Sequence, residues 1–119
     1  MENYVIELLQ IQQQLKIYHW QTKSYARHQA YGKAYDDLSD LIDSFVEVHM
    51  GKYGRFSLSQ PGIELTDLSD SNAKEFADIS VEFLTSLTEK LDPKDSDLLN
   101  IRDEMLAVMN RLKYLMTLQ

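Results

Sequence analysis

The scarcity of residues that interrupt helices most constrains the fold of this chain. Its 119 residues include only four glycines and two prolines, and Pro61 and Gly62 stand next to each other. Long segments therefore run without a helix-breaking residue, which favours an all-α fold over the turn-rich pattern of β-proteins. A chain of this length can form a core of its own, so we expect a single domain over residues 1–119.

Apolar residues recur at steps of three and four, which is the spacing of a helix that packs on one side. In the first such segment the apolar stripe consists of Tyr4, Leu8, Ile11, Leu15, Tyr18 and Tyr25. The pattern predicts four helices, over residues of about 3–25, 28–53, 72–91 and 93–117. A four-helix bundle is therefore the expected architecture.

Local signals mark two of the expected helix starts. Asn72 and Glu75 have the spacing of a capping box, in which each side chain bonds to the main chain of the other residue. Asp92 followed by Pro93 combines a preferred N-cap residue with the residue favoured at the first helical position. We expect the third and fourth helices to start at these positions.

Residues 55–72 form a long irregular stretch, with a Pro-Gly turn and a run of serine, aspartate and asparagine. About 17 extended residues reach roughly 56 Å, whereas a helix of about 25 residues is roughly 37 Å long. The connection can therefore either wander over the surface or cross the whole bundle, which would make the second and third helices parallel. One long central crossover is the ferritin-like arrangement of a four-helix bundle.

Composition excludes several classes of site and partner. The chain has no cysteine, so any metal must be held by histidine, carboxylate or main-chain oxygen rather than by thiolate. The formal net charge is −7 and the basic residues are scattered, which counts against duplex DNA as a partner. We recognise no signal peptide and no apolar run near the roughly 20 residues of a membrane span, so a cytoplasmic protein is expected.

Candidate metal ligands are His19, His28, Asp43 and Glu47. Asp43 and Glu47 are four residues apart and so share one helix face, on which Asp36 and Asp40 also lie. The carboxylates and the histidines can each also have a purely structural role. The carboxylates can form a solvated acidic face, and the histidines can be hydrogen-bonded residues at the boundary of the core.

Other conspicuous side chains have structural interpretations. Trp20 is most simply a packing residue or an interface anchor. His49 continues the apolar stripe of the second helix and ends that helix, where an imidazolium would interact well with the helix dipole. Met105, Met109 and Met116 are expected in the core, because methionine commonly fills gaps there.

Two segments resemble a known family. "YHWQTKSYARH" followed by "LSDLIDSFVEVHMGKYGR" is similar to the Dps-type miniferritins, the dodecameric iron-storing members of the ferritin-like superfamily. The resemblance implies that His19 and His28 of one subunit and Asp43 and Glu47 of its neighbour form an iron-oxidising centre at a two-fold interface. His19 and Trp20 match the family's His-Trp pair. The segments also resemble small uncharacterised ferritin-like proteins of large DNA phages and algal viruses.

This sequence departs from the miniferritin pattern at several places. The family's additional aspartate, one turn after the second histidine, falls on Gly32, and Asp36 lies one turn further on as a substitute. The joint between His19 and His28 is about three residues shorter than is usual in the family. The chain also lacks the N-terminal extension that some miniferritins use to contact DNA.

The resemblance implies a homo-oligomeric metal-binding protein, with iron at a mononuclear or dinuclear site and zinc as another metal that the ligands suit. The implied reaction is ferroxidase chemistry, the oxidation of iron(II) by oxygen or peroxide, in the host cytoplasm if the protein is viral. The alternative is a non-catalytic helical scaffold that retains the ferritin-like fold. A cage assembly is implied by the resemblance alone, and protection of DNA is disfavoured by the net charge.

Overall fold

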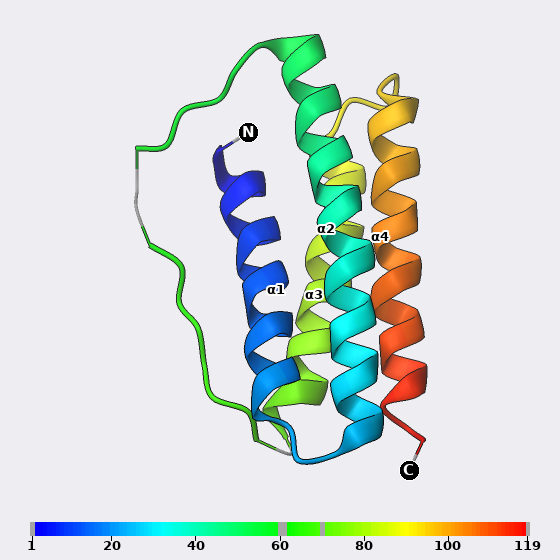
Figure 1. The fold of residues 1–119 in the computed structure, drawn as a ribbon. Coiled ribbons are helices and arrows are strands. Elements are labelled where there is room, and N and C mark those ends of the chain that lie inside the picture. The colour runs from blue at the N-terminus through cyan, green and yellow to red at the C-terminus, as the bar shows by residue number, and fades with distance from the viewer. Residues whose placement is uncertain (1, 60–61, 70, 119) are drawn as a thin grey trace.

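The computed structural model describes residues 2–59, 62–69 and 71–118. These residues form four helices, α1 (Glu2–Gln21), α2 (Tyr25–Tyr53), α3 (Asn72–Lys90) and α4 (Ser96–Leu115) (Figure 1). No strand occurs in this part of the chain, so the predicted all-α class is confirmed. Over the same residues, none of the helices is long and apolar enough to span a bilayer.

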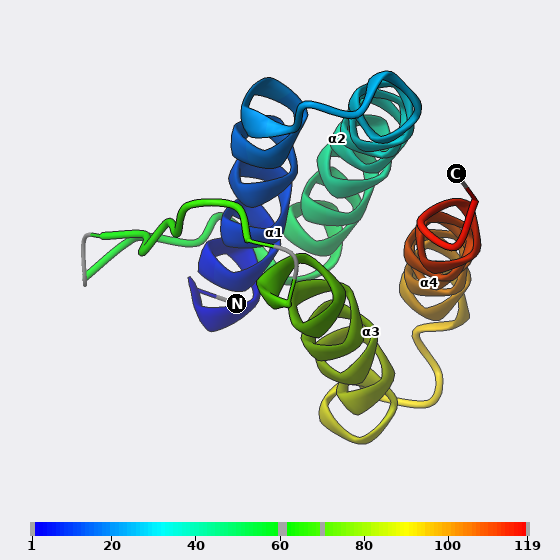
Figure 2. The same ribbon diagram turned by 90° about the horizontal axis from the view of Figure 1, so that it is seen from below.

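The long connection between α2 and α3 crosses the length of the bundle. Figure 1 shows it leaving the upper end of α2, descending outside α1 and entering α3 at the lower end. Helices α2 and α3 therefore run parallel, while α1 and α2, and likewise α3 and α4, are antiparallel neighbours. Helix α1 packs on α2, α2 on α4 and α4 on α3, and Figure 2 shows the four helices enclosing a common centre.

Two glutamine side chains of α1 hold this crossover in place. The Gln14 amide donates to the Thr66 carbonyl at 2.7 Å and accepts from the Thr66 N–H at 3.0 Å. Gln21 accepts from the Leu68 N–H at 2.7 Å and donates to the Asp67 carboxylate at 2.8 Å. Because Gln14 is buried, its donor and acceptor need these partners. The crossover is thus fixed against one flank of α1.

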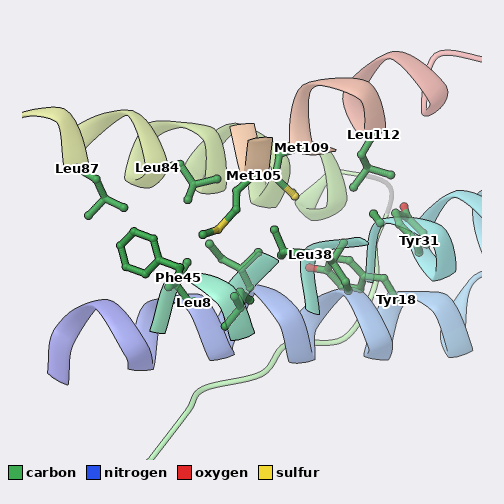
Figure 3. Packing of buried hydrophobic residues seen from close by; sticks show 14 of the residues in the cluster. Leu8, Tyr18, Tyr31, Leu38, Phe45, Leu84, Leu87, Met105, Met109 and Leu112 are labelled. Atoms are coloured by element: carbon green, nitrogen blue, oxygen red, sulfur yellow. The ribbon is translucent and has the colours of Figure 1, made fainter. Parts of the chain in front are cut away.

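The core contains side chains from all four helices (Figure 3). The predicted stripe is confirmed from Leu8 to Tyr18, but Tyr25 begins α2 and is exposed. Met105 and Met109 of α4 are fully buried as expected, whereas Met116 is only partly buried against the core. In α3 the buried face includes Ala73 and Ala77, whose small side chains allow neighbouring helices to approach closely. The apolar spacing of this segment predicts a stripe of Phe76, Ile79, Phe83 and Leu87, but Ile79 is 55% exposed.

Three helix ends differ from the prediction. The first helix ends at Gln21 rather than near residue 25, and the second starts at Tyr25 rather than 28. Ser24 explains the early restart, because its hydroxyl accepts the Arg27 N–H at 3.2 Å and caps α2. The fourth helix starts at Ser96 rather than at Asp92-Pro93.

The side chains at the two predicted caps make other hydrogen bonds. Asp92 accepts from the Lys94 N–H at 2.9 Å, so it forms a tight turn before α4 instead of capping the helix. Asn72 is the first helical residue, and its amide accepts from the Ser69 N–H at 2.8 Å. The expected capping box between Asn72 and Glu75 is therefore wrong, and Asn72 closes the end of the crossover.

Candidate metal centre

His19 and His28 are brought together at the lower end of the α1–α2 hairpin. His19 lies in the last turn of α1 and His28 in the first turn of α2, on either side of a three-residue joint, residues 22–24. Their imidazole rings are stacked, with centroids 3.8 Å apart and planes inclined by 18°. Both side chains are partly exposed, so the pair lies at the boundary between core and solvent.

Each histidine is oriented by the main chain of the other. His19 Nδ1 lies 2.7 Å from the His28 carbonyl oxygen, and His28 Nδ1 lies 2.7 Å from the His19 carbonyl oxygen. A carbonyl oxygen only accepts, so each Nδ1 carries the proton and donates. In the neutral rings both Nε2 atoms therefore keep a free lone pair. This tautomer, fixed by an Nδ1–H bond to a carbonyl, is the one that metal-ligating histidines commonly adopt.

Gly32 provides the space that the His19 ring occupies. A Cβ atom added at Gly32 would lie 2.9 Å from both Cε1 and Nδ1 of His19, closer than non-bonded carbon atoms approach. Any other residue at position 32 would therefore displace the ring from its place against α2. The missing aspartate at this position follows from packing, since a carboxylate side chain there is incompatible with the observed position of His19.

The predicted carboxylate ligands lie far from this pair within one chain. Asp36, Asp43 and Glu47 are exposed on α2, and a rise of 1.5 Å per residue places them about 12, 22 and 28 Å along the helix from His28. Within the described residues no group of three or more histidine and acidic side chains is close enough to hold a metal. The structure thus brings together His19 and His28 and leaves the acidic residues apart from them.

Exposed aromatic side chains flank the histidine pair. Trp20 is 65% exposed and Tyr25 is 75% exposed, which excludes core packing as the role of Trp20 in the single chain. The Lys16 ammonium lies 5.6 Å from the centroid of the Trp20 ring system and 4.6 Å from the Tyr35 ring centroid. These distances are within the range of cation–π contacts. The surface next to the pair is therefore both aromatic and cationic.

A second polar cluster, which sequence reasoning missed, ties the end of α2 to the start of α4. The Asp95 carboxylate accepts from Lys52 at 2.8 Å and from the Tyr53 hydroxyl. The hydrogen bonds from Lys52 and Tyr53 lower the pKa of Asp95, and the hydrogen bonds that Lys52 donates to Asp95 and Asp97 raise the pKa of Lys52. No spacing rule connects side chains so far apart in the sequence, so only the fold reveals the cluster.

His49 lies beside this cluster. Its ring centroid is 4.9 Å from that of Tyr53, and its Nδ1 is buried without a hydrogen-bond partner among the described residues. Burial lowers the pKa of His49. Desolvation of the charged form therefore opposes the imidazolium that the end of the helix would favour.

These features define an all-helical protein of four packed helices with an oriented histidine pair. The chain belongs to DUF5856, a family of unknown function, whose model matches residues 19–116. It is 30% identical over 101 residues to an uncharacterized 14.6 kDa protein in the mobD-ri intergenic region of Enterobacteria phage T4, covering 85% of this chain and 75% of the phage protein. This relative agrees with the expected similarity to phage proteins. No solved structure matches the chain.

Proposed function

We propose that this protein is a metal-binding homo-oligomer that takes up iron(II) at a site shared between two copies of the chain. The observation that carries the proposal is the reciprocal hydrogen bonding of His19 and His28, which leaves both Nε2 lone pairs free. Two neutral imidazoles are suitable ligands for iron(II) and zinc. The tautomer is already set in the unliganded chain, so metal binding need not change which nitrogen atom carries the proton.

The remaining ligands come from a second copy. Two nitrogen atoms leave a divalent metal incompletely coordinated, and carboxylates are the expected additional ligands in ferritin-like sites. Asp43 and Glu47 are exposed one turn apart on α2, but the length of that helix separates them from the pair of their own chain. In a two-fold pair of copies with antiparallel α2 helices, each histidine pair faces the acidic pair of the other chain, giving two equivalent sites.

The topology supports a ferritin-like interpretation of the fold. Parallel α2 and α3, joined by a crossover that spans the bundle, form the connection expected of ferritin-like bundles. Bound iron(II) would supply the reducing electron for oxygen or peroxide. The carbonyl oxygens of His19 and His28 would orient the two imidazoles. Gly32, which has no side chain, would leave the space that the His19 ring occupies. Asp36 would join the ligands only from the second copy.

A non-catalytic scaffold is the second candidate. The exposed Trp20, with Lys16 over its ring, suits an interface that holds copies together without metal. This candidate predicts an oligomer that persists when metal is removed by a chelator. The shared-site proposal predicts instead that chelation weakens association, because metal ligation would contribute to the interface.

The decisive experiment is an anaerobic iron(II) titration of metal-stripped protein, followed by addition of oxygen or peroxide and measurement of the near-ultraviolet absorbance of oxidised iron. We expect saturable binding and oxidation in the wild type. Glu47→Ala should lose both, whereas Glu82→Ala, which removes an exposed glutamate of α3, should keep both. Equal binding by the two variants would contradict the assignment of Glu47.

Mixed oligomers test whether the site is shared. A variant without His19 and His28 and a variant without Asp43 and Glu47 should each bind no iron. When the two are unfolded and refolded together, about a quarter of the wild-type sites should return, since half of the pairs are mixed and each has one intact site. No recovery in a mixture whose subunits demonstrably exchange would overturn the sharing.

A further inference from the structure

A cavity of about 450 Å³ opens at the lower end of the molecule, between the start of α2, the start of α3 and the end of α4. Its wall contains three basic side chains, Arg27, Lys74 and Lys113. Ala77 and Met116 add apolar surface, and Tyr114 lies at the rim with 62% of its surface exposed. None of the described residues that line the cavity is acidic.

The charge of this cavity is opposite to that of the whole chain. The protein has 12 basic and 19 acidic residues and a net charge of −7, yet three of the basic residues converge on one hollow. Lys113 pairs with Asp78 at 2.7 Å, with both side chains substantially exposed. Lys74 makes no ion pair within the part of the chain that the structure describes, although, after the hydrogen bond from Lys113, its charge also lowers the pKa of Asp78. An anion in the cavity would reduce the repulsion among these cations.

Arg27 is positioned before any ligand arrives. Its guanidinium donates to the Met116 carbonyl oxygen at 3.2 Å, which ties the first turn of α2 to the end of α4. A guanidinium has five N–H donors in a planar fork, so most of them remain available to an incoming group. This fork matches the oxygen atoms of a phosphate and binds them bidentately.

The crossover brings two helix starts to this end. Because α2 and α3 run parallel, both helices start at the lower end of the bundle (Figure 2). The N-terminus of a helix carries a partial positive charge and the C-terminus a partial negative one, so the starts of α2 and α3 favour an anion whereas the end of α4 at the same cavity opposes it. The positive charge of the site therefore comes from the three basic side chains. Tyr114 beside the apolar wall offers a flat face on which an aromatic ring can stack.

We propose that this cavity binds a nucleotide-sized organic phosphate. The phosphate lies among Arg27, Lys74 and Lys113, and the aromatic ring of the ligand stacks on Tyr114. The site is separate from the histidine pair and does not depend on metal. Both parts of the ligand are required, because the cationic side chains recognise the phosphate and the tyrosine with its apolar neighbours recognises the ring.

Calorimetric titration with ATP in the presence of a chelator tests the proposal without interference from metal. Saturable binding is expected, with affinity falling as salt is added. Tripolyphosphate alone and adenosine alone should each bind at least about tenfold more weakly than ATP, since each lacks one half of the contacts. Absence of ATP binding at millimolar concentration would overturn the proposal.

Variants separate the two halves of the site. Lys74→Gln should weaken ATP binding by about tenfold, the loss expected of one charge-assisted contact, and Tyr114→Ala should weaken ATP but leave tripolyphosphate unchanged. Lys94→Gln, at an exposed lysine before α4, serves as the matched control and should bind as the wild type. Arg27→Gln is a further test. If that variant unfolds because it loses the Met116 contact, the result for Lys74→Gln is decisive. Equal ATP binding by Lys74→Gln and Lys94→Gln would refute the site.

Discussion

His19 and His28 exchange hydrogen bonds from each Nδ1 to the other's main-chain carbonyl oxygen, both at 2.7 Å. The two residues are nine positions apart and lie on opposite sides of the joint between α1 and α2. Each ring is therefore oriented by a carbonyl group that substitution of a side chain does not remove. Loss of one ring removes the stacking partner and one proposed metal ligand, while the other ring keeps its hydrogen bond.

His19→Gln should reduce affinity for zinc or iron(II) by at least about tenfold, because one of two imidazole ligands is lost. Competition with a chromophoric chelator measures the change. His49→Gln is the matched control, since it removes a histidine at the opposite end of α2. If both substitutions reduced affinity equally, the bound metal would not be at the stacked pair.

Gly32→Ala should reduce metal affinity while changing the free energy of unfolding by less than about 1 kcal/mol. The new methyl group would displace the His19 ring, but alanine also gains about 1 kcal/mol over glycine in a helix, so the two effects offset. Metal competition and urea unfolding on the same sample separate the two quantities.

Gly51→Ala is the control for that substitution. Gly51 also lies within α2, and a Cβ atom there would have no neighbour within 4 Å. We expect it to stabilise the protein by up to about 1 kcal/mol and to leave metal affinity unchanged. Unchanged metal affinity in Gly32→Ala would contradict the role of Gly32 in making space for the ring.

The stability of the protein should fall as the pH is lowered below about 6.5, the ordinary pKa of a histidine. Burial lowers the pKa of His49 in the folded state. Between about 6.5 and the folded value, the unfolded chain therefore takes up a proton that the folded chain does not, which favours unfolding. His49→Phe should flatten this dependence in urea unfolding between pH 7 and 5.

Asp95 contributes to the pH dependence of stability in a lower pH range. Hydrogen bonds from Lys52 and Tyr53 lower its pKa, so its stabilising effect is present above about pH 3.9 and is lost as the pH falls through the folded value. Asp95→Asn should therefore reduce the loss of stability below about pH 3.9. An unchanged slope at pH 7 to 5 in His49→Phe would refute the assignment of that range to His49.

Gln14→Ala should loosen the crossover. The substitution removes the donor and the acceptor that bond to Thr66, at a cost of about 1–2 kcal/mol in the free energy of unfolding. Limited proteolysis should cleave residues 54–71 faster than in the wild type. Gln13→Ala should retain the wild-type cleavage rate, because among the described residues the Gln13 side chain bonds only to neighbouring Gln12.

Much of the fold could be predicted because the helices carry regular apolar stripes. Leu8, Leu15, Met105 and Met109 lie in the core where their spacing placed them. Helix ends were predicted less well, since Ser24 and Asp92 act through local hydrogen bonds that a sequence pattern does not specify. The direction of the crossover could be given only as one of two alternatives. The length of a connection shows how far it can reach but not which path it takes.

The candidate site could likewise be predicted from the sequence only in part. The resemblance to miniferritins selected His19 and His28 correctly as a spatial pair, but their reciprocal hydrogen bonds depend on the geometry of the joint. Gly32 suggested a lost ligand, whereas in the structure it provides the space for a ring. The contacts of Asp95 with Lys52 and Tyr53 could not have been foreseen, since they join residues more than 40 positions apart.

The crossover also bears on the order in which the chain assembles. Contacts between α1 and α2 need only the closure of a three-residue joint, whereas docking of α4 on α2 must wait until the long connection has closed. Local contacts form faster than distant ones. The paired histidines belong to the first, local unit, so we expect their stacking to precede docking of the second hairpin, and a nascent chain would have the ring pair before it has a complete core.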